Sequence, residues 1–171
     1  MKAITGLLGR DDLVETVARE ARKGRHLLLT GRPGIGKSSV LEAVLDRLIV
    51  RQDTLVLHVH EHQAKGQFLE LARGLLESGL LKPSALDLDA GLDALDPAAL
   101  EWAKLKRSVN RLSIRDLCAA IVPALHAHRG RVLVAVDDLT AVTPTLVAFW
   151  LAVLDAAQLV ACASEKRKNV A

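Results

Sequence analysis

Apolar residues along the chain follow two different spacings, which predict strands and helices in turn. Short uninterrupted apolar runs are typical of strands that are buried on both faces of a sheet. Stretches with an apolar residue at every third or fourth position are typical of helices with one buried face. The runs predict strands over 26–30, 54–60, 131–136 and 159–163, and the wider spacing predicts helices over 12–23, 40–48, 68–79, 113–130 and 143–154.

The order of these elements predicts an α/β fold with a parallel sheet, because a strand, a helix and a second strand form a right-handed crossover unit. The chain has 171 residues, the size of one domain, and we expect residues 1–171 to form a single core. Prolines, a glycine and aspartates stand between leucines in residues 81–99. We therefore expect a long connection in that segment.

A glycine-rich loop follows the first predicted strand and leads directly into a helix, and the three together span residues 26–50. This order is that of the P-loop, or Walker A motif, in which backbone N–H groups at a helix N-terminus hold phosphate oxygens. Glycine allows the tight turn and the close approach of the backbone to the phosphates. The residues that we assign to nucleotide binding on this basis are Gly31, Arg32, Pro33, Gly34, Ile35, Gly36, Lys37, Ser38 and Ser39.

Two side chains of this loop have the chemistry of a magnesium–nucleotide site. Lys37 can reach the β- and γ-phosphates, which makes it a candidate catalytic residue, and the Ser38 hydroxyl can bind Mg²⁺. Such a site needs an acid at the end of another strand. Asp137 follows the apolar run of the segment 131–138 and is the candidate Walker B ligand of the metal.

Asp138 comes directly after this acid and is the candidate general base that polarises the attacking water. An aspartate is one methylene shorter than the glutamate that more often has this role. Two interpretations therefore remain open. Either the water is held in a different way, or hydrolysis is slow and the protein acts as a nucleotide-dependent switch.

Composition and charge limit the cellular location and the kinds of binding partner that we expect. The net charge of +3 does not require a nucleic-acid partner, although DNA is not excluded. Cys118 and Cys162 stand among apolar neighbours, so we expect two reduced thiols and a cytoplasmic protein. The apolar stretch 146–163 is interrupted by Asp155 and Gln158, so we expect a helix and a strand there and no membrane span.

Three motifs together resemble the AAA+ and STAND ATPases, nearest to the branch of the archaeal initiator-like and signalling NTPases. They are Leu8-Gly9-Arg10-Asp11-Asp12-Leu13, the glycine-rich loop, and Val132-Leu133-Val134-Ala135-Val136-Asp137-Asp138. The resemblance implies a three-layer αβα P-loop NTPase sandwich with the strand order 5-1-4-3-2. It also implies that Leu8, Gly9 and Arg10 lie near the adenine of a bound ATP.

The chain departs from this family in two respects. The polar residue that senses the γ-phosphate has only Ser164, or less well placed Asn169, as its counterpart. The chain ends at Ala171, so we expect four strands, without the fifth strand and the helical lid of the family. A nucleotide bound to such a chain would be exposed, and hydrolysis would depend on a partner or a second subunit that completes the site.

Two further groups of residues admit a simple and a functional interpretation. His58, His60 and His62 alternate around Glu61 and form either a polar strand end or a metal site, and Glu61 could instead contact the attacking water. The basic residues at helical spacing form either a solvated face or a surface for DNA or another subunit. These basic residues are Lys104, Arg107 and Arg111.

The function that we expect is binding of ATP with Mg²⁺, with hydrolysis coupled to a change of conformation or assembly. The alternatives are a nucleotide-dependent interaction or DNA-associated switch module without turnover, and a small nucleotide or metabolite kinase. A GTPase of the common type would carry an Asn-Lys-x-Asp motif, which the sequence lacks.

Overall fold

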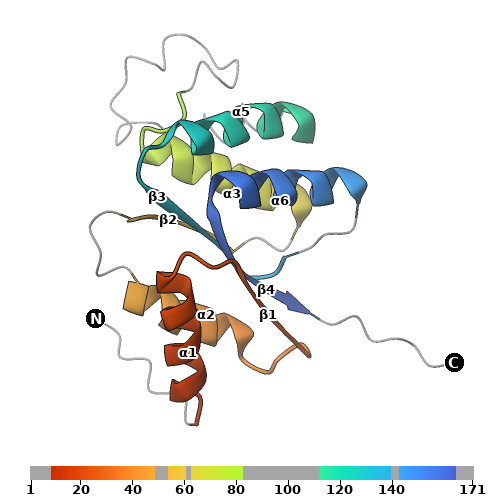
Figure 1. Ribbon diagram of the computed structural model, residues 1–171. Helices are drawn as coiled ribbons and strands as arrows, with labels where there is room; N and C mark the ends of the chain where they lie inside the picture. Colours follow the sequence, from red (N-terminus) through yellow and green to blue (C-terminus); the bar gives the residue numbers. More distant parts are fainter. Residues whose placement is uncertain (1–8, 49–53, 61–62, 83–111, 140–142, 165–171) are drawn as a thin grey trace, which may run out of the picture.

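The computed structural model describes residues 9–48, 54–60, 63–82, 112–139 and 143–164, in which helices and strands alternate along the chain (Figure 1). All four predicted strands are confirmed, with ends that differ by at most two residues. Most of the long connection predicted for residues 81–99 lies outside the described residues. The elements are α1 (Asp11–Arg22), β1 (Leu27–Gly31), α2 (Lys37–Leu48), β2 (Thr54–Val59), α3 (Ala64–Glu77), α5 (Ile114–Ala127), β3 (Arg131–Val136), α6 (Pro144–Ala156) and β4 (Gln158–Ser164).

The four strands form one parallel sheet in the order β1-β4-β3-β2. This is the 1-4-3-2 part of the order that the family resemblance implied. Parallel strands bring their carboxyl ends to the same edge of the sheet. Gly31 at the end of β1 pairs with Ser164 on β4, and Val136 at the end of β3 pairs with Val59 on β2. Residues that follow these strands therefore gather at one edge.

Helices cover both faces of the sheet, which confirms the three-layer αβα architecture. Figure 1 shows α1 and α2 on one face and α3, α5 and α6 on the other. Alternate residues of β3 divide between the two cores: Val132, Val134 and Val136 pack on the α3 side, and Leu133 and Ala135 pack on the α2 side. This burial on both faces explains the uninterrupted apolar run in the sequence.

The amino-terminal edge of the sheet is fastened to the end of α1 by two side chains. The buried Gln158 donates from Nε2 to the carbonyl oxygens of Ala21 at 2.9 Å and Arg25 at 2.8 Å. Arg131 donates from Nε to Oε1 of Gln158 at 3.1 Å and also bonds the carbonyl oxygens of Ala21 and Arg22. The last carbonyls of a helix lack partners within the helix, and these bonds satisfy some of them. They fix α1, which begins next to the glycine-rich loop.

The predicted caps of two helices are also confirmed. Ser113 and Asp116 form a reciprocal capping box at the start of α5, and the Thr143 side chain accepts from the amide of Leu146 at the start of α6. The apolar stretch 146–163 divides into α6 and β4, as predicted. Among the described residues, no helix is long and apolar enough to cross a membrane.

Candidate nucleotide-binding site

The glycine-rich loop connects β1 to α2 at the carboxyl edge of the sheet, where the sequence predicted it. Gly34 and Gly36 have φ values of 79° and 83°, in the left-handed region that favours glycine. The first helical backbone bond runs from the amide of Val40 to the carbonyl of Gly36 at 3.1 Å. The amides of residues 37–39 precede it, at the end of a helix that presents N–H groups to an anion.

Lys37 lies back over this loop. Its Nζ donates to the carbonyl oxygens of Gly31 at 3.1 Å and of Arg32 at 3.0 Å. These two bonds hold the ammonium group above the loop backbone, on the side where phosphate oxygens would meet the amides of α2. Lysine is a strongly hydrated cation on a flexible stem, so exchanging these carbonyls for phosphate oxygens needs only a change of rotamer.

Arg10 contacts the loop from the start of α1. A Cβ added to Gly36 would stand 3.2 Å from Nη1 of Arg10, so the guanidinium lies against the loop backbone. Gly9, with φ of 86°, turns the chain into this position. The structure therefore brings Arg10 to the loop, whereas no contact joins Gly9 to it among the described residues, and Leu8 lies outside those residues.

Asp137 occupies the carboxyl end of β3, one residue beyond the strand. Its amide donates to the carbonyl of Val59 at 2.9 Å, which continues the pairing between β3 and β2. Its Oδ1 is buried and has no hydrogen-bond partner among the described residues. A buried carboxylate oxygen without a partner is costly, and a hydrated cation is the group that would satisfy it. Asp137 thus offers a buried carboxylate oxygen of the kind that Mg²⁺ prefers as a ligand.

The thiol of Cys162, on β4, is affected by a charge from the glycine-rich loop and by a charge from the end of β3. Burial and, to a smaller extent, the Asp137 carboxylate raise the pKa of its thiol to about 12, while the Lys37 ammonium acts in the opposite direction. Cys162 is therefore near both charged groups. Cys118 on α5 is half-buried, and burial raises the pKa of its thiol as well. Both cysteines are free, as predicted.

Asp138 is held by a residue that the sequence interpretation missed. Nε2 of Gln67, on α3, donates to the backbone oxygen of Asp138 at 2.5 Å. Gln67 is completely buried. A polar amide inside the apolar stripe of α3 was the signal that could have drawn attention to it, although its partner stands 71 positions away in the sequence.

The structure describes one of the two candidate sensor residues, Ser164. The pairing of Gly31 with Ser164 places Ser164 at the carboxyl edge beside the glycine-rich loop. Asn169 lies outside the described residues. Glu61 and His62 lie outside them too, as do the basic residues predicted to share a helix face, Lys104, Arg107 and Arg111.

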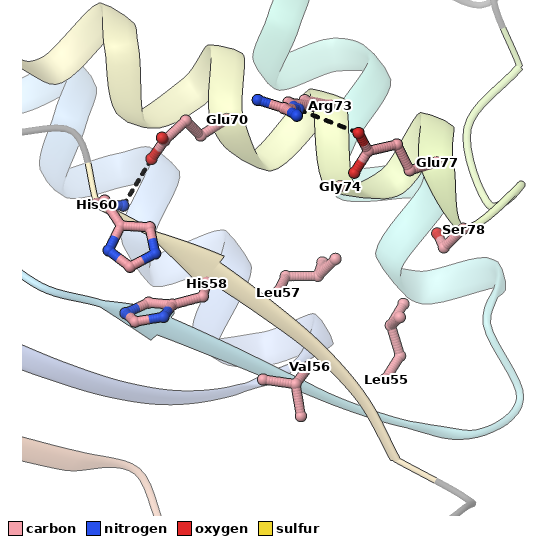
Figure 2. Close-up of a pocket in the computed structure, with 10 residues that line it drawn as sticks. All are labelled: Leu55, Val56, Leu57, His58, His60, Glu70, Arg73, Gly74, Glu77 and Ser78. Atoms are coloured by element: carbon pink, nitrogen blue, oxygen red, sulfur yellow. Dashed lines mark hydrogen bonds and ion pairs between the residues drawn. The ribbon is translucent and has the colours of Figure 1, made fainter. Parts of the chain in front are cut away.

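His58 and His60 form a contact pair at the end of β2, with ring centroids 3.7 Å apart. Burial lowers the pKa of His58, and the neighbouring His60 lowers it further. The backbone amide of His60 donates to Glu70 on α3 at 2.6 Å (Figure 2). In the part of the chain that the structure describes, no group of three His, Cys, Asp or Glu side chains could hold a metal. The predicted metal site also involves His62, which lies outside the described residues, so it stays a prediction.

The same strand borders a hollow of about 460 Å³ between β2 and α3 (Figure 2). Arg73 and Glu77 form an ion pair at 3.1 Å in its wall. No residue of the glycine-rich loop lines this hollow. It is a feature of the sheet edge, separate from the nucleotide site.

Comparisons with known proteins find a matching family model, a curated relative and a solved structure. The model of the AAA ATPase domain family matches residues 6–168. The tRNA modification GTPase MnmE of Methylococcus capsulatus is 30% identical over 135 residues, which cover 77% of this chain and 28% of that protein. A solved structure on DNA unwinding at forked double-stranded DNA by two coordinating Pif1 helicases is 13% identical, with a TM-score of 0.40, over 88% of this chain and 32% of that one. The chain thus spans less than a third of either relative.

Proposed function

Because the chain belongs to the AAA ATPase domain family, we propose that its glycine-rich loop binds ATP together with Mg²⁺ and that hydrolysis is coupled to a change of conformation or assembly. Nucleotide binding in general follows from the family and the P-loop fold. The choice of ATP, the metal, the residue roles and the cytoplasmic setting are the proposal. The likeness to the archaeal initiator-like and signalling branch stays a prediction.

The unpartnered Oδ1 of Asp137 is the observation that carries this proposal. Stability alone would favour a neutral or paired group at a buried strand end. Local rules of stable folding are broken mainly at functional sites. A carboxylate oxygen that is buried at the carboxyl edge of the sheet, with no partner among the described residues, is such a violation. A magnesium ion with its bound water would remove it.

In the proposed reaction the backbone amides at the start of α2 bind the phosphate oxygens and Lys37 holds the β- and γ-phosphates in place. Mg²⁺, held by Ser38 and Asp137, would supply neutralisation of the charge that develops on those oxygens. The carboxylate of Asp138 accepts a proton from a water molecule as the water oxygen attacks the γ-phosphorus. The bond from that phosphorus to the bridging oxygen breaks, and ADP leaves with the electron pair.

The base is proposed to be adenine, although one relative is a GTPase. The matched family is one of ATPases. The sequence has no Asn-Lys-x-Asp motif to read guanine. Arg10, which the family resemblance places near the adenine, lies against the loop at Gly36. Displacement of a fluorescent ATP analogue by ATP and by GTP checks this choice, with tighter binding of ATP as the expected result.

A second candidate is a nucleotide-dependent interaction module that binds ATP without turnover. The loop residues Arg32, Pro33 and Gly34 are exposed, and exclusion of water from the reacting phosphate is part of efficient catalysis. A partner protein or a second copy of the chain would have to cover them. This candidate shares the binding step with the first and differs only in hydrolysis.

Turnover of Mg-ATP by the wild type, Asp138→Asn and Asp155→Asn separates the candidates. Asp155 is an exposed aspartate on α6 and makes the same substitution a matched control. Hydrolysis that is lost in Asp138→Asn and kept in Asp155→Asn supports the ATPase. Tight binding without turnover in the wild type supports the interaction module. A wild type that binds no Mg-ATP would overturn both.

A further inference from the structure

Gln67 is a buried polar residue, and hydrogen bonds to the described residues satisfy only one end of its side-chain amide. It is on α3 and directly precedes Phe68, which belongs to the core between α3, α5 and α6. Its Nε2 donates to the backbone oxygen of Asp138, but its Oε1 is buried and has no partner among the described residues. An unsatisfied buried acceptor destabilises the folded state. An apolar residue of similar size would avoid that cost.

The comparison with Gln158 shows how unusual this arrangement is. Both glutamines are buried, but Gln158 uses both ends of its amide: Nε2 donates to two carbonyls and Oε1 accepts from Arg131. Gln158 is satisfied as a structural clamp. Gln67 makes one bond with its side chain, and that bond is to the segment that carries the candidate catalytic base.

Where residues 137–139 leave the sheet, hydrogen bonds connect them to β2, β4 and α3. The amide of Asp137 donates to the carbonyl of Val59 at the end of the edge strand β2, and the amide of Leu139 donates to the carbonyl of Cys162 on β4 at 2.7 Å. The carbonyl between them, on Asp138, accepts from Gln67 on α3. The first two bonds join backbone groups. The third comes from a side chain, so Gln67 connects the peptide of Asp138 to α3.

We propose that Gln67 is a positioning residue that orients Asp138 for its reaction with the attacking water. By holding the carbonyl, it fixes the peptide plane and so the direction in which the carboxylate leaves the backbone. This inference rests on the proposed function, because it gives Asp138 the role of general base. Loss of the bond leaves the nucleotide-binding loop unchanged and misaligns only the base.

Steady-state kinetics of Gln67→Met test the proposal against a structural role. Methionine keeps the length of the side chain and removes the donor. We expect kcat to fall about 10- to 100-fold, since small misplacements of a catalytic group have effects of this size, with KM and the Kd for Mg-ATP within about twofold of the wild type. Gln158→Met is the matched control, with reduced stability and unchanged kcat. A Gln67→Met enzyme with the wild-type kcat would overturn the proposal.

A double-mutant cycle with Asp138→Asn identifies the group through which Gln67 acts. If Gln67 positions Asp138, adding Gln67→Met to Asp138→Asn leaves the residual rate unchanged. If the two losses multiply instead, Gln67 acts elsewhere and the proposal is wrong.

Amide hydrogen exchange without nucleotide supplies a readout that does not need turnover. Gln67→Met should speed exchange at Leu139, while the amides of β3 stay protected. Equal exchange at Leu139 in the wild type and in Gln67→Met would show that Gln67 does not hold this segment. A wild type without turnover would instead refute the proposed function and, with it, the catalytic role of Gln67. The exchange result would still show whether Gln67 holds the segment of Asp138.

Discussion

The guanidinium of Arg10 lies so close to Gly36 that a Cβ on this glycine would stand 3.2 Å from Nη1. Arg10 begins α1, and Gly36 immediately precedes α2. The contact therefore joins the two helices of one sheet face at the glycine-rich loop. It also means that the loop tolerates a side chain at Gly36 only if Arg10 moves.

Gly36→Ala should weaken Mg-ATP binding at least tenfold and destabilise the fold. The left-handed φ of 83° costs an alanine about 1–2 kcal/mol, and Arg10 must also shift to admit the new methyl group. Gly24→Ala is the matched control, because Gly24 has a similar φ of 81° with no heavy atom near its virtual Cβ. Calorimetric titration and urea unfolding of both variants check this: both lose stability, and only Gly36→Ala loses affinity. Equal affinities in the two variants would contradict the role of Gly36 in the site.

Asp137→Asn should remove the effect of magnesium on nucleotide binding while leaving the metal-free protein at least as stable as the wild type. The substitution removes a buried carboxylate oxygen that has no partner among the described residues. Urea unfolding without metal, and ATP titrations with Mg²⁺ and with EDTA, measure the two effects. A metal-free variant that is much less stable than the wild type would show that Asp137 has a structural partner instead.

Gln158→Leu should destabilise the protein by about 3 kcal/mol without changing its affinity for nucleotide. The change leaves carbonyls at the end of α1 and the guanidinium of Arg131 without their bonds. Gln63→Leu is the control, since Gln63 is exposed and its side chain makes no cap bond at the start of α3. Its unfolding free energy should change by less than about 0.5 kcal/mol. Similar losses in both variants would contradict the clamp.

The two cysteines should react with a thiol reagent at different rates at pH 8. Cys162 is fully buried and its thiol pKa is raised to about 12, so it should react only on unfolding. Cys118 is half-buried and should react faster, which Cys118→Ala identifies. Because the folded pKa of Cys162 exceeds the ordinary 9.0, the folded state holds this proton more tightly. Stability should therefore fall as the pH rises above 9.0, and less so in Cys162→Ala. Rapid labelling of folded Cys118→Ala would contradict this burial.

Much of the fold was predictable because its signals are local. The uninterrupted run before Asp137 identified a strand buried on both faces, and the glycines of the loop identified the turn into α2. Ser113 with Asp116, and Thr143 with Pro144, identified two helix starts. The strand order came from the family resemblance, since no local pattern states which strands are neighbours.

The contacts that shape the site were not predictable in the same way, because they join distant parts of the chain. Gln67 meets Asp138 across 71 positions, and Gln158 meets Ala21 across 137. Nothing near Gln158 or Gln67 in the sequence shows that the amide of Gln158 is bonded at both ends and that of Gln67, among the described residues, at one end only. That difference arises from the packing of α3 and α1 against the sheet, which also decides that Oδ1 of Asp137 is buried.

The affinity of Lys37→Ala for Mg-ATP tests the central claim most directly. Lys37 reaches over the glycine-rich loop, with its Nζ 3.1 Å from the carbonyl of Gly31. Lys23→Ala is the control, because it removes the same charge from an exposed residue at the end of α1. We expect the Kd of Lys37→Ala to rise at least tenfold, with the Kd of Lys23→Ala unchanged. Equal Kd values for the wild type and Lys37→Ala would contradict the assignment of this loop as the nucleotide site.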